Sequence, residues 1–333
     1  MREKWLRQVQ ILNRMDEKER RLFLLGRGGG LLWRVVRMAL LLCMSFVVLY
    51  PILYMISVSF RESADLYDPT VIWIPRHWTT ENFRLVMETM NFWPTLLSTL
   101  RLSFVSTLLN VAVCALAGYG FARFRFRLKN LAFACVLCTI IIPPQNVSIP
   151  MYMQYVNFDF LGIGSLIGCF TGSAVGVPLL NSELTIYLPA MLGQGLRAGL
   201  FIYIFRQFFR GLPRELEAAA YIDGCGIFKT FWRIMLPNAG ASLLTCSLFS
   251  FVWYWNDYYT MSMYFNEPKT LSVSLAMLKD VLRGQGMDMY TNPYVIVTQM
   301  QAACLLTILP LLVLYIVLQR YFTESVERTG LVG

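Results

Sequence analysis

The sequence has unusually few charged residues. Asp, Glu, Lys and Arg make up only 15% of its 333 residues, whereas a soluble domain carries about 25%. Long stretches such as 38–60 contain no charged residue at all. Crossing the hydrocarbon core of a bilayer takes about 20 apolar residues of helix, and several stretches reach that length. The composition therefore excludes an ordinary soluble domain and indicates an integral membrane protein.

Groups that support catalysis or bind metals are also scarce. The single histidine, His77, is predicted to be a solvated loop residue, with no nucleophile or base clustered beside it in the sequence. Cys135 and Cys138 form a C-x-x-C pair, but no further His or Cys lies near enough in sequence to complete a zinc site. We read this pair as two small residues of a membrane helix. The sequence predicts no catalytic residue, no metal site and no bound cofactor.

The N-terminal segment is basic and lacks an early uninterrupted apolar core. Residues 1–37 hold ten Lys or Arg residues, so we expect this end to stay in the cytoplasm. The pattern over 5–25 is typical of an amphipathic helix lying on the inner leaflet. The glycines within 26–30 then predict a flexible joint, and they are not a P-loop because no G-K-[ST] follows. Residues 1–35 are thus expected to form a cytoplasmic extension.

Hydropathy predicts an all-α integral membrane protein with six spanning helices and an additional N-terminal cytoplasmic helix. The predicted spans are 36–58, 95–121, 131–149, 184–204, 241–265 and 295–317. They lie within a transmembrane domain of residues 36–322, and residues 323–333 are expected to form a cytoplasmic tail.

The distribution of positive charge fixes the predicted orientation. With both termini inside, the cytoplasmic segments carry 21 Lys or Arg residues and the outer loops carry 6. This bias is typical of cytoplasmic loops, and it explains the net charge of +9 without nucleic acid as a partner. Arg101 and Arg197 fall inside predicted spans. We expect Arg101 to extend toward the outer surface and Arg197 to pair with a carboxylate.

The segment 161–180 is apolar and long enough to span, but a span there would move five positive charges of residues 206–240 outside. It carries glycine at every fourth position from Gly164 to Gly176, a pattern that allows close packing against a neighbouring helix. We therefore expect it to be a re-entrant or outer-surface segment.

The cytoplasmic segment 213–237 has the pattern of a short helix, a turn and a second helix. Pro213 suits the first helical position, and Glu215 and Glu217 lie near the positive helix N-terminus. Three alanines then give a face with little side-chain bulk, and Gly224 can adopt the left-handed conformation that ends a helix. A second helix over 227–235 is predicted to stop before Pro237. Taken alone, the segment could also be an ordinary loop.

This segment resembles the EAA loop of binding-protein-dependent ABC importer permeases, whose pattern is E-A-A-x3-G-x9-I-x-L-P. Ala219, Ala220 and Gly224 match, and Ala218 stands where the family has Glu, with Glu217 one residue earlier. Other stretches are similar to the smaller permease of the maltose-type, carbohydrate-uptake group: Y-P at 50–51, Y-G-F-A-R-F-R-F at 119–126, F-R-Q-F-F at 205–209, W-N-D at 255–257 and Q-R-Y-F at 319–322.

The resemblance implies a type I permease fold in the bacterial cell membrane, acting as a sugar or oligosaccharide importer rather than an enzyme. It implies a second, homologous permease, two ATP-binding subunits that hold ATP and Mg, and an extracellular solute-binding protein. The docking helix implied for the ATPase comprises Glu215, Glu217, Ala218, Ala219, Ala220, Asp223 and Gly224. On this view ATP binding closes the ATPase dimer and moves the permeases from inward-open to outward-open.

A carboxylate near the outer end of the fifth predicted span suggests a solute pathway. Asp257 lies beside Asn256, with Trp253 and Trp255 close in sequence. A charged group at membrane depth usually faces a cavity or a partner, and aromatic faces with polar groups suit sugars. An interfacial anchor or a contact with the partner permease is the alternative interpretation of these four residues.

Two alternatives come from other classes. An ion-coupled secondary transporter would show internal repeats and several intramembrane carboxylates, and only Asp257 is a candidate. An intramembrane enzyme would need clustered catalytic groups, which the sequence lacks. Within the family, the alternative is an importer of another solute, such as a polyamine or a peptide.

Overall fold

The computed structural model describes residues 17–159, 176–284 and 293–330, and the regular structure in these ranges is helical apart from two isolated bridges. Three helices are long and apolar enough to cross a membrane unbroken. They are α2 (Glu17–Ser59) over Trp33–Ser59, α5 (Phe92–Arg123) over its whole length and α17 (Pro293–Gly330) over Ile296–Arg320. These three helices coincide with the first, second and sixth predicted spans, in that order.

The other predicted spans are broken. The third consists of α6 (Lys129–Ile141) and α7 (Pro144–Val156), which meet at 100°. The fourth consists of α9 (Leu184–Met191) and α10 (Ala198–Gly211). The fifth consists of α14 (Gly240–Trp255) and α15 (Tyr259–Tyr264).

The number of spans follows from these breaks. The described residues contain three candidate spans, or up to five if each sharply bent helix pair is one span. The predicted six is not reached by this criterion, because α9 and α10 are each too short to cross alone.

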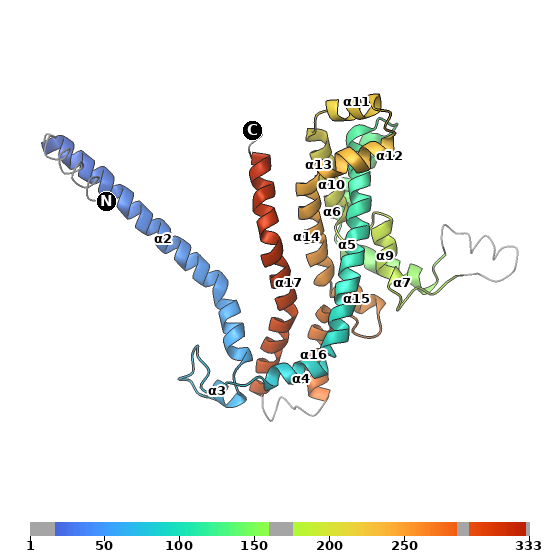
Figure 1. Cartoon of the computed structure of the whole chain (residues 1–333). Coiled ribbons are helices and arrows are strands. Elements are labelled where there is room, and N and C mark those ends of the chain that lie inside the picture. Colours follow the sequence, from blue (N-terminus) through green and yellow to red (C-terminus); the bar gives the residue numbers. More distant parts are fainter. Residues whose placement is uncertain (1–16, 160–175, 285–292, 331–333) are drawn as a thin grey trace.

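Helix α5 is the centre of the bundle, and α10, α14 and α9 pack directly against it (Figure 1). Gly118 sets the approach of α10. A Cβ atom at this position would lie 2.5 Å from the Phe205 Cβ and 3.0 Å from the Arg206 backbone nitrogen. The absence of a side chain therefore lets the two helices touch.

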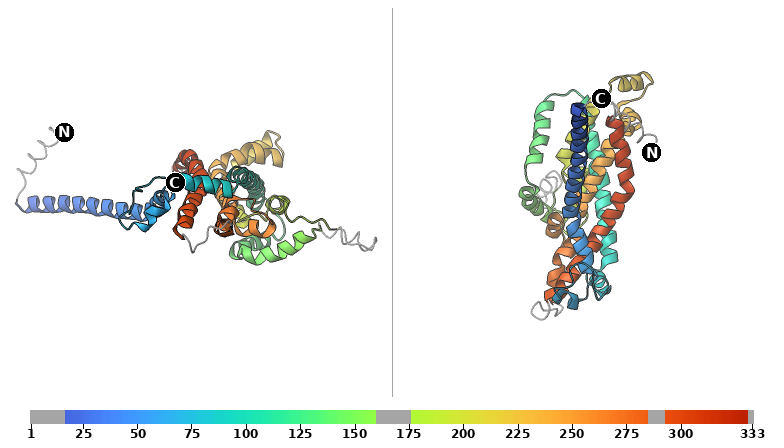
Figure 2. Two further views of the ribbon diagram at one scale, coloured as in Figure 1. Left: turned by 90° about the horizontal axis from the view of Figure 1, so that it is seen from below. Right: turned by 90° about the vertical axis from the view of Figure 1, so that its left-hand side faces the viewer.

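Helix α2 diverges from the rest of the bundle, as Figures 1 and 2 show, and the contacts that it makes are mainly with α17. Its side chains from Trp33 to Leu49 are exposed although most are apolar. The helix also runs continuously through residues 26–30, where the sequence predicted a flexible joint. Glycine weakens a helix by about 1 kcal/mol per residue but does not forbid one, so helical residues on both sides carry it through.

The two ends of the molecule differ. The beginning of α2, the end of α17 and helix α11 (Glu215–Ile222) lie at one end, and α3 (Ser63–Tyr67), α4 (Glu81–Thr89) and α16 (Leu271–Gly284) lie at the other (Figure 1). The first and last described residues therefore share a side with α11. The predicted amphipathic helix over 5–25 and the glycine-rich segment 161–180 lie largely outside the described residues.

The loop after α2 is organised around two buried charged side chains. Arg61 donates hydrogen bonds to the Val71 and Ile72 carbonyl oxygens at 3.1 and 2.7 Å. Asp65 accepts from the backbone amide of His77 at 2.9 Å and faces its ring Nδ1 at 2.7 Å. His77 is exposed, as predicted for a loop residue, but it has this carboxylate as a partner. The hydrogen bond to Asp65 raises the pKa of His77 above its ordinary value.

Candidate functional site

Helix α11 forms a knob beyond the end of the bundle. It begins at Glu215, two residues after Pro213, so the proline precedes the helix instead of occupying its first position. The Arg214 carbonyl accepts the first helical hydrogen bonds, from the amides of Glu217 and Ala218 at 3.1 Å. At the other end Gly224 has φ of +77°, the left-handed conformation predicted for it, and the Cys225 amide bonds back to the Ala220 carbonyl.

The second helix of the knob is longer than predicted. It starts as α12 (Ile227–Thr230), widens to a π turn, η2 (Phe231–Met235), and continues as α13 (Leu236–Asn238). The predicted stop before Pro237 was wrong. Proline cannot donate the backbone hydrogen bond of an α-helix and clashes with the preceding turn, and the wider π turn before it accommodates this.

The outward side of the knob carries four large apolar side chains among charged ones. Ile222 is 86% exposed and Phe228 is 71% exposed, and Tyr221 and Ile227 lie beside them in sequence and are also exposed. A contiguous patch of exposed apolar side chains is typical of a protein or membrane contact. We call these four side chains the knob face.

The implied docking residues divide between this outward side and the interior. Glu215, Ala218, Ala219, Asp223 and Gly224 are exposed, whereas Glu217 and Ala220 are buried. Successive residues of an α-helix point about 100° apart, so one helix cannot present all seven to a partner. The carboxylate of Glu217 accepts a hydrogen bond from the Tyr119 hydroxyl at 2.7 Å and lies 3.4 Å from the Arg123 Nε.

A cavity of about 530 Å³ lies in the bundle where the broken helices meet. Its wall includes Ile142 and Pro144 at the α6–α7 bend, residues 193–197 between α9 and α10, and Asp257 between α14 and α15. Non-helical backbone at membrane depth is tolerated only where it is buried in protein or lines a water-filled cavity. The coincidence of three breaks with one cavity follows this rule.

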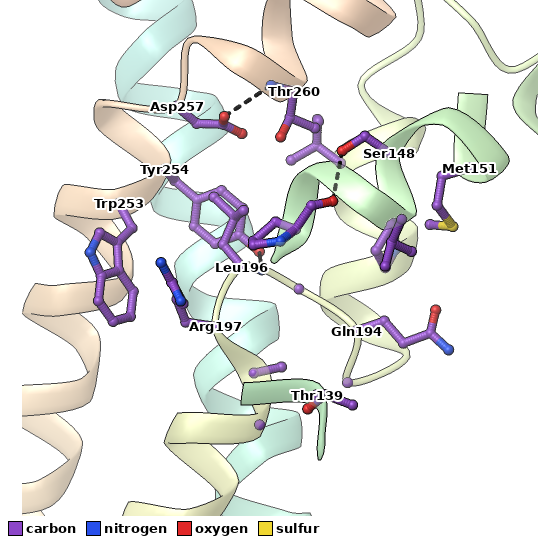
Figure 3. Close-up of a pocket in the computed structure, with 18 of the residues that line it drawn as sticks. Thr139, Ser148, Met151, Gln194, Leu196, Arg197, Trp253, Tyr254, Asp257 and Thr260 are labelled. Carbon is purple, nitrogen blue, oxygen red and sulfur yellow. Dashed lines mark hydrogen bonds between the residues drawn. The ribbon is translucent and has the colours of Figure 1, made fainter. Parts of the chain in front are cut away.

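The cavity combines aromatic, charged and hydroxyl groups. Trp253, Arg197 and Asp257 lie around it with Thr260 and Ser148 (Figure 3). The Arg197 guanidinium carbon lies 5.7 Å from the centre of the Trp253 ring. Asp257 Oδ1 accepts a hydrogen bond from the Thr260 amide at 3.0 Å, while its buried Oδ2 has no partner among the described residues. Such a lining can bind a polar solute that also has apolar faces.

Two of the four residues predicted for a solute pathway lie outside this cavity. Trp255 is 1% exposed and packs against Phe251 in the core, and Asn256 is exposed and donates to the Val252 carbonyl. Trp253 and Trp255 are two positions apart on α14, so their side chains point about 200° apart and cannot face one cavity.

Arg197 has a role that the sequence did not reveal. No carboxylate of the described chain lies within ion-pair distance of it, so the predicted pairing is replaced by the contact with Trp253. Its φ of +56° places it at the start of α10, after the break. Arg101 pairs with Glu183 instead of only extending to the surface.

The break between α9 and α10 could have been recognised from the sequence. Its signals were Gly193, Gly195 and Pro189, because all three residues disfavour a continuous helix.

Known proteins resemble this chain over most of its length. The arabinooligosaccharides transport system permease protein AraQ of Halalkalibacterium halodurans is 28% identical over 294 residues, which cover 87% of this chain and 93% of AraQ. The diacetylchitobiose uptake system permease protein NgcG of Streptomyces coelicolor is 26% identical, over 87% of this chain and 86% of NgcG.

A solved structure shares the fold. The crystal structure of a bacterial ABC transporter involved in the import of the acidic polysaccharide alginate contains a chain that matches with a TM-score of 0.66 and 20% identity, over 87% of this chain and 96% of that one. Residues 112–328, which hold both the knob and the cavity, match the family described as binding-protein-dependent transport system inner membrane component. This chain belongs to that family of membrane transport proteins.

Proposed function

We propose that this chain is a membrane-spanning permease subunit of an ATP-driven importer, and that its solute is a sugar or an oligosaccharide. The match of residues 112–328 to an importer permease family carries the first part. The second part is supported by the names of AraQ and NgcG, which are permeases for arabinooligosaccharides and diacetylchitobiose. The aromatic and polar lining of the cavity agrees with such a solute.

The knob is the proposed site of coupling to ATP hydrolysis. Its face, formed by Tyr221, Ile222, Ile227 and Phe228, would enter a cleft of a separate ATP-binding subunit. ATP and Mg would be held by that subunit, with two copies in the assembly. A partner can drive a conformational change only if its contacts differ between two states, and a rigid, closely fitting contact provides this.

The remaining partners follow from membership in a binding-protein-dependent family. We propose a second, homologous permease that completes the membrane domain, and an extracellular protein that delivers the solute. The solute would pass the cavity beside Trp253 and Asp257. The exposed apolar surface of α2 would face lipid and the second permease.

The proposed orientation places α11 and both chain ends in the cytoplasm of a bacterium. Basic residues gather at this end: Arg125, Arg206, Arg210 and Arg214 all interact electrostatically with Lys129. Such clusters are typical of the cytoplasmic side.

Cys225 tests the orientation, because it lies in the knob and is partly exposed. In a variant that keeps only this cysteine, an impermeant maleimide should label it in inside-out vesicles and not in intact cells. Labelling in intact cells would overturn the orientation.

Reconstitution tests the function. The purified assembly of both permeases and the ATP-binding subunits should be placed in liposomes with the solute-binding protein and radiolabelled arabino- and chito-oligosaccharides. We expect uptake that requires ATP and the binding protein. Uptake driven by an ion gradient without ATP would indicate a secondary transporter. ATP-dependent uptake of a polyamine or peptide, and of no saccharide, would retain the importer and reject the sugar.

A further inference from the structure

Glu217 belongs to the docking knob by sequence but faces the helices of its own subunit. Glu217 is only 9% exposed, and its carboxylate lies against the end of α5 that is proposed to be cytoplasmic. A buried carboxylate is costly unless it is paired and hydrogen-bonded. Both conditions are met here, by the Tyr119 hydroxyl at 2.7 Å and by Arg123, whose Nε lies 3.4 Å from the second carboxylate oxygen.

The two partners of Glu217 are themselves held firmly. Tyr119 is 1% exposed, and its ring contacts Phe209 of α10 and Phe231 of η2. Arg123 donates from Nη2 to the Leu212 carbonyl at 2.7 Å, in the link between α10 and α11. We call Glu217, Tyr119 and Arg123 the anchor cluster. It joins the first turn of α11 to the last turns of α5.

The same helix has a second polar attachment close to the cavity. Asn110 is fully buried, and its Nδ2 donates to the Leu196 carbonyl at 3.1 Å and lies 3.4 Å from Ser250 Oγ. Leu196 is part of the cavity wall at the α9–α10 break. Asn110 and Tyr119 are nine residues apart on one unbroken helix, which corresponds to about 14 Å along its axis.

We propose that Glu217 is a positioning residue that fixes α11 to α5. When the ATP-binding subunit displaces α11, α5 then moves with it, and Asn110 carries the displacement to the broken backbone at the cavity. The inference rests on the proposed function. It assigns Glu217 a contact within the permease in place of a contact with the ATPase, and it assigns the coupling to a rigid helix with an attachment at each end.

The test compares transport with ATP hydrolysis in the reconstituted assembly. The variants are Glu217→Gln, which removes the charge at nearly constant size, and Tyr119→Phe, which removes only the hydroxyl. Matched controls are Glu267→Gln, an exposed glutamate at the outer end, and Tyr315→Phe, an exposed tyrosine of α17. The measurements are solute imported per ATP hydrolysed, and the amount of ATP-binding subunit that co-purifies with each variant.

We expect both variants to retain the ATP-binding subunit and to import about threefold less solute per ATP, or less still, whereas the controls keep the wild-type ratio. An unchanged ratio in both variants would overturn the proposal. So would weakened retention of the ATP-binding subunit in Glu217→Gln with an unchanged ratio in the remaining complexes, because that identifies a direct docking contact. If Glu217→Gln does not assemble, Tyr119→Phe decides.

Failure of the proposed function itself would look different. In that case the wild-type assembly would show no ATP-dependent uptake at all. An active wild type with normal ratios in both Glu217→Gln and Tyr119→Phe would reject only the positioning role.

Discussion

The Tyr254 hydroxyl accepts a hydrogen bond from the Leu196 backbone amide, with 3.1 Å between oxygen and nitrogen. This bond ties α14 to the break between α9 and α10. Gly195 makes room for it, since a Cβ at that position would lie 2.6 Å from the same hydroxyl. Backbone groups that the break releases from a helix are thus satisfied by a side chain of another helix, which allows irregular backbone beside the cavity.

Replacing Tyr254 by Phe should destabilise the protein. The ring would still fill its site, but the partly buried Leu196 amide would lose its acceptor, at a cost of about 0.5–1.5 kcal/mol. Thermal unfolding of the purified protein should show a lower midpoint for Tyr254→Phe than for Tyr315→Phe, in which the altered tyrosine is exposed. Equal midpoints for the two variants would mean that the bond contributes nothing to stability.

Gly118→Ala should be destabilising where Gly211→Ala is not. The new methyl group at position 118 meets Phe205 and the α10 backbone, which cannot move aside, whereas position 211 has nothing within 4 Å. Overpacking of this kind costs about 1–3 kcal/mol, while alanine at an open helical position is neutral or stabilising by about 0.4–1 kcal/mol. Unfolding midpoints of the two variants should therefore lie on opposite sides of the wild-type value, or Gly211→Ala should coincide with it.

Asp257→Asn should impair uptake without loss of assembly. The amide removes a negative charge whose Oδ2 is buried beside the cavity, while Asp280→Asn makes the same change at an exposed position of α16. Uptake at limiting solute should fall by about tenfold or more, which corresponds to the loss of one hydrogen bond to a charged group, and Asp280→Asn should transport normally. Normal uptake by Asp257→Asn would remove this residue from the solute pathway.

Ile222→Asp and Phe228→Asp should release the ATP-binding subunit. Each places a charge in the knob face, and a charge buried unpaired in an apolar interface is strongly unfavourable. We expect co-purification of the ATP-binding subunit to fall by about tenfold or more. Ile74→Asp, at an exposed apolar position in the loop after α2, is the matched control. Full retention of the subunit in both knob variants would place the docking surface elsewhere.

The pair of His77 and Asp65 should make the loop after α2 sensitive to pH. The bond to Asp65 raises the pKa of His77, so protonated His77 stabilises the loop. This stabilisation is fully present below the ordinary pKa of 6.5 and is lost as pH rises through the raised pKa. For Asp65, burial acts to raise the pKa, but hydrogen bonds from His77 and Arg76 outweigh it and lower the value. The stabilisation of the loop by ionised Asp65 is present above the ordinary pKa of 3.8 and is lost as pH falls through the lowered pKa.

The measurement is direct because the chain has a single histidine. A titration of the His77 ring by NMR should give a pKa above 6.5 in the wild type and a lower one in Asp65→Asn. The loop should be most resistant to proteolysis between about pH 4 and 6.5, where both ordinary values favour the charged pair. A wild-type pKa at or below 6.5 would show that the pair does not form.

Hydropathy predicted which segments enter the membrane but not how their backbones run. It read 184–204 as one span because Leu, Ile and Phe dominate the average, although Gly193, Gly195 and Arg197 interrupt the helix. Gly193 and Arg197 both have positive φ, a backbone conformation that an average of side-chain polarity does not detect. The cavity depends on these breaks, so its location could not be derived from hydropathy.

The knob was easier to predict than the orientation of its side chains. Pro213, the alanines and Gly224 are local signals, and they predicted a helix with a glycine stop where the structure has α11. The burial of Glu217 depends on Tyr119 and Arg123, which are almost a hundred positions away in the sequence. Side-chain direction toward a distant helix is set by packing, which spacing within one loop does not reveal.

Glu217 lies one position before the family's glutamate, whose place Ala218 takes, and this offset has a consequence for comparing relatives by sequence alone. A shift of one residue turns a side chain by about 100° around a helix, so a carboxylate at 217 and a carboxylate at 218 belong to different surfaces. Aligning carboxylates at these two positions as equivalent would confuse a contact within the permease with a contact between subunits. Chimeras that transplant this loop between permeases should therefore carry the matching end of α5 with it.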